Sequence, residues 1–258
     1  MHLVKTYLIN LHKDQDRLKW MESQFKDFPF ERFDAFKPVT IPDNIRGIFP
    51  KDNPVLLPSE QACFASHLKI LHNISQANKS NVDYWLICED DLRVDLAFMD
   101  IVREIPLDLC GDIIRLNDYP KTPSKRLHQL NNYQLISFGR IPSGTGSYLI
   151  NQKGAKAIIN LAKEIRIPYD LFLREIGCGQ LKTTGIHPPP LIQNQLGSSS
   201  IIDCYRKLGK RKFTYKNQRS RWNRARHEIE KLNINYLFKL FQFKLSSNKR
   251  DKFGKYLY

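Results

Sequence analysis

The chain has 258 residues, of which 41% are hydrophobic and 11% aromatic. This composition is typical of a globular protein with a full core and excludes a disordered chain. No run of 18 or more apolar residues occurs, so the sequence predicts no transmembrane helix. The apolar part of the N-terminus is short and lacks a small-residue cleavage site, so we expect no signal peptide. Five scattered cysteines without a CxxC pair favour buried thiols in a reducing compartment over disulfides or a zinc site.

The net charge of +15 is concentrated at the C-terminal end. Residues 205–258 contain 17 Lys and Arg against three acidic residues, whereas residues 1–204 contain 24 bases against 23 acids. The sequence therefore predicts two parts, a nearly neutral domain over residues 1–202 and a basic tail over residues 203–258. Such a tail favours anionic partners, either a membrane surface or nucleic acid.

The first elements follow a β–α–β pattern. Residues 3–11 are rich in β-forming residues and predict a strand, followed by a polar turn and a helix. Residues 30–36 predict a second strand, and the proline-rich residues 37–58 predict a long irregular loop. A helix is expected to follow, with Ser59 as its N-cap. His67 lies in the middle of this helix, where a histidine is more often a structural group than a ligand.

The most informative stretch is residues 83–95, DYWLICEDDLRVD. Its apolar first half predicts a strand buried on both faces. Glu89, Asp90 and Asp91 follow directly, and three carboxylates held close together need a positive partner. Since ligands bind at the carboxyl ends of strands in open α/β sheets, we expect a site for a divalent cation and a nucleotide here. A solvated acidic turn is the alternative.

The second half continues the alternation of helices and strands. We expect a helix over residues 96–105, a strand over 112–117, a loop over 119–132 and a strand over 133–138. Small residues then precede an apolar run, and Asn151 is expected to cap the next helix.

Three further features carry candidate site residues. The run Gly144, Thr145, Gly146 and Ser147 would allow a ligand to approach the backbone closely, unless it is an ordinary glycine turn. Asp170 falls near the start of a short helix, with Glu175 further along it. Three prolines stiffen the loop over residues 183–195 and would fix the position of His187.

Several of these segments together resemble glycosyltransferase family 25, the lipooligosaccharide galactosyltransferases of Gram-negative bacteria. The matching segments occur in the family's order over residues 1–195 and are YLINLHKDQDR, FERFDAF, ACFASHLKI, WLICEDD, DIIRLN, GTGSYLINQKGAKAI and IPYDLFL. The tail after residue 202 is covered poorly. The resemblance implies an α/β fold of the GT-A-like type, a mixed sheet flanked by helices, with a basic and mainly helical C-terminal extension.

The resemblance also implies roles for individual residues. Metal-dependent members hold Mn²⁺ or Mg²⁺ through a DxD-type motif, which here has Glu89 in place of the first Asp. Asp91 is then the expected metal ligand, with Asp90 and His187 as further ligands and Glu89 or Asp90 near the ribose. The nucleotide sugar is expected to be bound by a further set of residues, namely Asn10, Arg17, Gly144, Thr145, Gly146 and Ser147.

The resemblance implies an inverting transfer, and a direct displacement of this kind needs a general base for the acceptor hydroxyl. Asp170 matches the family's YD position and is the first candidate, with Glu175 second. A helix N-cap is the structural alternative for Asp170.

The expected activity is transfer of a hexose from a UDP-sugar to the lipooligosaccharide core, with UDP-galactose first and UDP-glucose next as donor. Aromatic and aliphatic residues recur at helical spacing among the bases of the tail, which suits peripheral binding to the anionic cytoplasmic face of the inner membrane. Packing of this stripe on the catalytic domain is the alternative. Nucleic-acid binding and another metal-dependent nucleotide transferase remain competing functions, but no nucleic-acid-binding motif supports the former and we expect no nucleic-acid partner.

Overall fold

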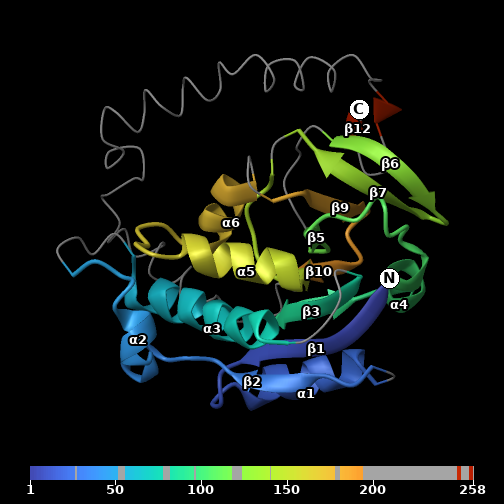
Figure 1. Cartoon of the computed structure of the whole chain (residues 1–258). Coiled ribbons are helices and arrows are strands. Elements are labelled where there is room, and N and C mark those ends of the chain that lie inside the picture. The colour runs from blue at the N-terminus through green and yellow to red at the C-terminus, as the bar shows by residue number, and fades with distance from the viewer. Residues whose placement is uncertain are drawn as a thin grey trace, which may run out of the picture.

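The computed structural model describes residues 1–26, 28–51, 56–77, 82–95, 97–117, 124–139, 141–177 and 181–193, and the backbone of residues 249–250 and 256–257. An eight-stranded mixed sheet forms its centre, in the strand order β2-β1-β3-β8-β5-β9-β7-β6 (Figure 1). The strands are β1 (His2–Asn10), β2 (Glu31–Asp34), β3 (Asp83–Glu89), β4 (Leu92–Val94), β5 (Ile113–Arg115), β6 (Ser124–Leu130), β7 (Tyr133–Phe138), β8 (Ser147–Asn151), β9 (Thr183–His187), β10 (Leu191–Gln193), β11 (Lys249–Arg250) and β12 (Tyr256–Leu257). The helices are α1 (Gln15–Gln24), the 3₁₀ helix η1 (Pro38–Thr40), α2 (Asp43–Arg46), α3 (Pro58–Ser75), α4 (Phe98–Glu104), α5 (Gln152–Leu161) and α6 (Tyr169–Gly177).

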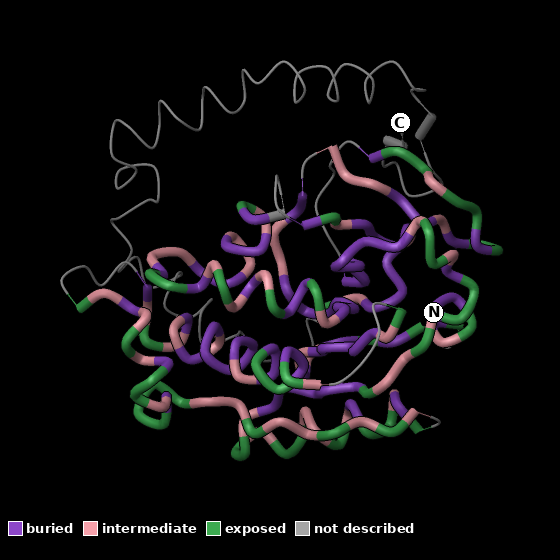
Figure 2. Tube along the Cα trace, in the orientation of Figure 1, coloured by how far each residue is buried: buried purple, intermediate pink, exposed green. Residues whose placement is uncertain are grey.

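Each face of the sheet carries its own hydrophobic core. Along β3, Trp85 and Ile87 point to the core shared with α3, α5 and α6, whereas Leu86 and Cys88 point to the core shared with α1 and α4. This alternation is the two-residue period of a strand. Because both faces are covered, β3 is buried along its middle, as its apolar run predicts (Figure 2).

The strand directions bring the carboxyl ends of several strands to the same edge of the sheet. β1, β2 and β3 are parallel, and β5 and β9 run the same way because both β3 and β5 pair antiparallel to β8. The carboxyl ends of β1, β3, β5 and β9 therefore share an edge. Strand β8 begins at that same edge, so the small residues before it lie beside the end of β3.

Two predicted loops are strands. Residues 124–130 were expected in a loop but form β6, which pairs with β7 through a turn at Asn131, whose φ is 48°. β6 is an edge strand that buries only Ser124 and Leu130, so its polar sequence gave no strand signal. Residues 183–193 form β9 and β10, with Pro188, Pro189 and Pro190 between them, instead of one stiff loop.

Helix starts follow the predictions in part. Ser59 is not the N-cap of α3, since the helix begins at Pro58 and the Glu60 carboxylate accepts a hydrogen bond from the backbone of Leu57. Proline is suited to a first helical position because its missing N–H has no partner there in any case. Asn151 caps α5 as predicted and accepts a hydrogen bond from Gly154 N at 2.8 Å.

The predicted boundary at residue 202 lies outside the described residues, as do the side chains of the basic tail. Only two short antiparallel backbone segments, β11 and β12, are described beyond residue 193. Among the described residues, no helix combines the length and the apolarity that crossing a membrane requires.

Candidate functional site

The three consecutive carboxylates at the end of β3 turn toward three different partners. Glu89 continues the alternation of β3 and faces the side covered by α3, where it meets His67 and Thr145. Asp90 faces β1 and α1, and Asp91 faces β10. The motif is thus divided among three environments, although the charges of Glu89 and Asp90 add to burial in raising the pKa of Asp91.

Asp90 is held by β1 and α1. Parallel pairing sets Ile9 opposite Glu89, so Asn10 stands beside Asp90 and donates from Nδ2 to Oδ2 at 2.7 Å. Arg17 donates from Nη1 to the other oxygen, Oδ1, at 2.8 Å. Burial raises the pKa of Asp90, and the contacts with Asn10 and Arg17 only partly offset this effect.

Asn10 is 1% exposed and both ends of its amide are engaged. In addition to Asp90, its Nδ2 donates to the backbone oxygen of Asp14 at 3.1 Å, and its Oδ1 accepts from Arg32 Nε at 2.9 Å. The Asn10 side chain therefore holds the Asp90 carboxylate in place by a hydrogen bond. Its contact with a nucleotide stays a prediction. Arg32 was not identified from the sequence, because its place beside Asn10 depends on the β1–β2 pairing.

Asp91 combines one engaged oxygen with one that is not hydrogen-bonded. Its Oδ2 accepts from Gln193 Nε2 at 2.8 Å. Its Oδ1 is buried and has no hydrogen-bond partner among the described residues. Burial, followed by the charge of Glu89, raises the pKa of Asp91 to about 6. A buried carboxylate oxygen without a donor is what a cation-binding position requires.

Gln193 was missed in the sequence. It reaches Asp91 because β10 pairs antiparallel with β4, which sets Gln193 opposite Leu92. The predicted late ligand, His187, precedes it on the chain and ends β9, where it lies opposite Gln134 of β7.

His187 shares the carboxyl edge with Glu89 but stands three strands away from it. The paired rows of β3, β8, β5 and β9 put Gly185 level with Ile87, and therefore His187 level with Glu89. Three strand spacings correspond to roughly 14 Å. This register sets His187 apart from Glu89, and its role as a metal ligand stays a prediction.

Glu89 contacts two groups on the α3 side. Its Oε1 accepts from Thr145 Oγ1 at 2.8 Å and lies 3.6 Å from His67 Nε2. Burial alone would raise the pKa of Glu89, but His67, Thr145 and the charge of Arg17 together bring it below its ordinary value. Glu89 is therefore the carboxylate of the three that is most readily ionised.

His67 belongs to a buried polar cluster that the sequence did not reveal. It is fully buried, and its Nδ1 lies 3.1 Å from Tyr148 Oη, which in turn lies 2.9 Å from Tyr169 Oη. The imidazole stacks on Tyr169 with ring centroids 4.3 Å apart. Cys63 stands one turn earlier on α3, and ligand atoms of Cys63, His67 and Glu89 all lie within 4.8 Å of one another. The CxxxH spacing on one helix was the available signal.

The small residues before β8 pack directly on the end of β3. Glu89 N donates to Gly146 O at 2.8 Å, and a Cβ at Gly146 would lie 3.3 Å from the Leu92 side chain. Gly144 has φ of 100°, a conformation that favours glycine. Ser147 Oγ is buried and has no hydrogen-bond partner among the described residues. These residues therefore pack closely on the end of β3, whereas close approach of a ligand and contact with a donor sugar stay predictions.

Asp170 and Glu175 lie on different sides of α6. They are five residues apart, or roughly 140° around the helix. Asp170 is partly buried in the first turn of the helix, and its charge contributes, after burial and Glu89, to raising the pKa of the Cys63 thiol. Glu175 is exposed. Asp170 is not an N-cap, because the helix already begins at Tyr169.

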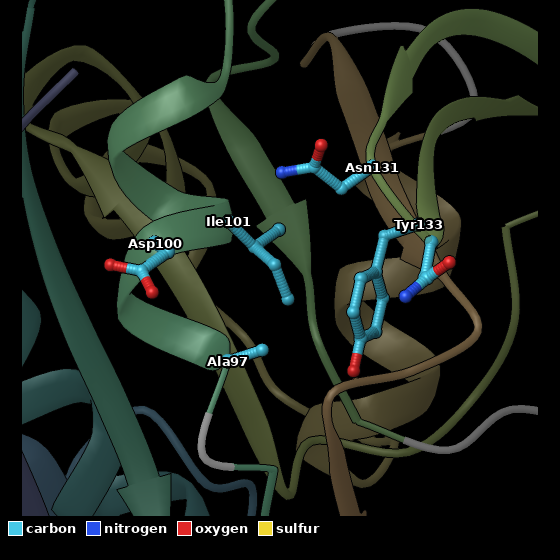
Figure 3. A pocket seen from close by; sticks show the side chains of 6 residues that line it. Ala97, Asp100, Ile101, Asn131 and Tyr133 are labelled. Carbon is cyan, nitrogen blue, oxygen red and sulfur yellow. The ribbon is translucent and has the colours of Figure 1, made fainter.

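A separate hollow of about 450 Å³ lies between α4 and the β6–β7 turn (Figure 3). Figure 3 shows Ile101 and Tyr133 on its two sides, with Asn131 above them. Neither Glu89 nor Asp91 lines it, and Asp100 is the only carboxylate among its lining residues. We therefore place the candidate site at the end of β3 and not in this hollow.

Comparison with protein families identifies the family of the chain. The model of glycosyltransferase family 25, described as an LPS biosynthesis protein, matches residues 3–173. The match spans β1, the three carboxylates, the small residues before β8 and Asp170. A search of curated proteins finds no match. On the strength of the family match, the chain belongs to glycosyltransferase family 25.

Proposed function

We propose that this glycosyltransferase of lipopolysaccharide biosynthesis is a metal-dependent hexosyltransferase that uses a UDP-sugar. The proposed donor is UDP-galactose, with UDP-glucose next, and the proposed acceptor is the lipooligosaccharide core. The observation that carries the proposal is Asp91 at the end of β3, with one oxygen buried and without a hydrogen-bond donor. The family match gives the class of reaction, and this oxygen supplies a reason for a cation beside it.

The residues around Asp91 fit a hard divalent ion. Carboxylate oxygens are ligands that Mg²⁺ and Mn²⁺ prefer, and the Gln193 amide donates from Nε2 to Oδ2 of Asp91, which leaves Oδ1 for the ion. When bound, the ion would offset the negative charge of the donor diphosphate. Asp90 would support it, since Asn10 and Arg17 fix both of its oxygens in place. A carboxylate oxygen has a second lone pair, so these contacts still permit ligation by Asp90.

The proposed sugar-binding wall is the segment from Gly144 to Ser147. It packs on the end of β3, and the buried hydroxyl of Ser147 lacks a partner among the described residues. Hydroxyls and backbone amides at such a wall suit a polyhydroxylated ligand.

We assign the general base to Asp170 in preference to Glu175. Asp170 is partly buried, and its charge, after burial and Glu89, raises the pKa of the Cys63 thiol, whereas Glu175 is exposed on another side of α6. In an inverting displacement, its carboxylate would accept the proton of the acceptor hydroxyl as that oxygen bonds to the anomeric carbon. The UDP leaves with the electron pair of the broken bond.

We place the enzyme at the cytoplasmic face of the inner membrane, held there by its basic tail. The part of the tail that carries the apolar stripe lies outside the described residues, so the proposal rests on its sequence, in which bases surround that stripe. Flotation of the full-length protein with vesicles containing anionic lipid is expected to carry it to the top, and with neutral vesicles to leave it behind. Equal recovery with both would remove the electrostatic part of the proposal.

A donor-hydrolysis and transfer screen tests the activity. UDP-galactose, UDP-glucose and UDP-N-acetylhexosamines are compared with Mn²⁺, with Mg²⁺ and with EDTA. We expect release of UDP from one hexose donor, dependent on the ion and on Asp91. Release that is unchanged in EDTA, or by Asp91→Asn, would contradict the metal-dependent reading.

A further inference from the structure

We propose that Cys63, His67 and Glu89 form a second metal site, for Zn²⁺ or a similar borderline-soft ion, separate from the hard-ion site at Asp91. This inference goes beyond the transferase activity and does not depend on it. The sequence favoured no zinc site at any of the five cysteines, and the proposal revises that expectation for Cys63 alone.

The geometry of the three residues is close to what zinc needs. Cys63 and His67 are four residues apart on α3, so both project from the same face of the helix toward the end of β3. Their ligand atoms and those of Glu89 lie within 4.8 Å of one another. Ligands at zinc bond lengths in a tetrahedron lie roughly 3.3–3.8 Å apart. The His67 Nε2–Glu89 Oε1 distance of 3.6 Å is already in that range.

The imidazole of His67 is oriented as a metal ligand. Its Nδ1 is occupied by the Tyr148 hydroxyl, and stacking on Tyr169 fixes the plane of the ring. Its Nε2 is fully buried and has no hydrogen-bond partner among the described residues. Metal-bound histidines usually hydrogen-bond through the ring nitrogen that does not bind the metal. Here that nitrogen is Nδ1, which leaves the lone pair of Nε2 for the ion.

The ligand types select the ion. A thiolate, an imidazole and a carboxylate suit Zn²⁺, whereas Mg²⁺ binds oxygen and does not favour a thiolate. Three protein ligands leave a fourth position for water. Burial raises the pKa of the Cys63 thiol, and the negative charges of Glu89, Asp170, Glu60 and Asp91 raise it further, so a cation at this position would offset the neighbouring carboxylates. An ion here would tie the middle of α3 to the end of β3.

Substitution with Co²⁺ tests the site directly in the full chain. Metal-free protein is titrated with Co²⁺, and we expect a thiolate-to-cobalt charge-transfer band together with the visible bands of tetrahedral cobalt. Zn²⁺ should displace the cobalt and raise the melting temperature, because an ion that binds only the folded state stabilises it. A cobalt spectrum with oxygen and nitrogen ligands only would overturn the proposal.

Variants identify the ligands. Cys63→Ser should abolish the charge-transfer band and weaken Zn²⁺ binding by at least about 100-fold, whereas Cys110→Ser, in the opposite core, should retain both. Tyr148→Phe removes the group that holds Nδ1 and should weaken binding by about 10–100-fold while keeping the band. A band that survives in Cys63→Ser would refute the site.

Two further measurements keep the test decisive. X-ray absorption at the zinc edge of the wild-type protein should show a sulfur ligand together with nitrogen or oxygen ligands, so the test does not depend on a variant that folds. Asp91→Asn should leave the cobalt band in place. Absence of sulfur from the zinc shell would contradict the zinc site even if the transferase activity were fully confirmed. Failure of the zinc site can therefore be distinguished from failure of the proposed transferase function.

Discussion

Replacing Asp91 with Asn should stabilise the metal-free protein at neutral pH. Burial and the neighbouring charge of Glu89 raise the pKa of Asp91 from its ordinary 3.8 to about 6. A carboxylate with a raised folded-state pKa costs nothing below the unfolded pKa. Between about pH 4 and pH 6 the unfolded chain ionises first, so the free energy of unfolding falls, and the full cost persists above pH 6.

The size of the effect follows from this shift. About two pKa units correspond to about 3 kcal/mol. Asn keeps an oxygen to accept from Gln193, but it places an amide N–H₂ where Oδ1 has no partner, which costs about 1 kcal/mol or more. The net gain is then about 1–2 kcal/mol, or about 2–8 °C in melting temperature for a domain of this size.

Thermal unfolding in EDTA measures this prediction. Asp91→Asn should melt above the wild type at about pH 8, and this advantage should be lost or slightly reversed at about pH 4, because the cost of the unpaired amide does not depend on pH. Added Mn²⁺ should stabilise the wild type and not the variant. Asp43→Asn, at an exposed position on α2, is the control and should change little. A variant that melts below the wild type at pH 8 in EDTA, or that still gains stability from Mn²⁺, would refute the reasoning.

The remaining predictions concern the base and the fold. Asp170→Asn should lower the transfer rate by about 10²–10⁴-fold with donor binding retained, whereas Glu175→Gln should keep a rate near that of the wild type. A steady-state assay in which Glu175→Gln loses the rate and Asp170→Asn keeps it would exchange their roles. Gly111→Ala should destabilise by about 1–3 kcal/mol or more in a urea melt, because its Cβ would lie 2.5–2.9 Å from three backbone atoms, whereas Gly47→Ala, with 3.6 Å to the nearest atom, should not. Asn151→Ala removes the cap of α5 and should cost about 1 kcal/mol, and an unchanged urea midpoint would show that the cap contributes little.

Local signals in the sequence predicted the buried elements well. The apolar run before Glu89 is a strand buried on both faces, and Asn151 caps its helix as expected. These features depend on neighbouring residues, and a run of apolar residues or a capping side chain has the same meaning wherever the chain folds. The order of the segments was also sufficient to identify the family.

Only the tertiary structure shows which residues each carboxylate of the acidic motif contacts. Consecutive residues in the sequence gave no sign that Asp90 is held by Asn10 and Arg17, or that Gln193 reaches Asp91. These contacts span 73 to 102 positions along the chain, and strand pairing sets them.

The same reason explains what was missed on α3. His67 looks like an ordinary core histidine in the sequence, and Cys63 like an ordinary buried thiol. Both residues lie near Glu89, and the Tyr148 hydroxyl contacts the imidazole of His67. These contacts depend on how α3 and β8 pack around the end of β3. The sequence by itself therefore determined the family, the central strand and its three acids. The fold decided that those acids serve three separate environments, because each side chain leaves the strand toward a different neighbour.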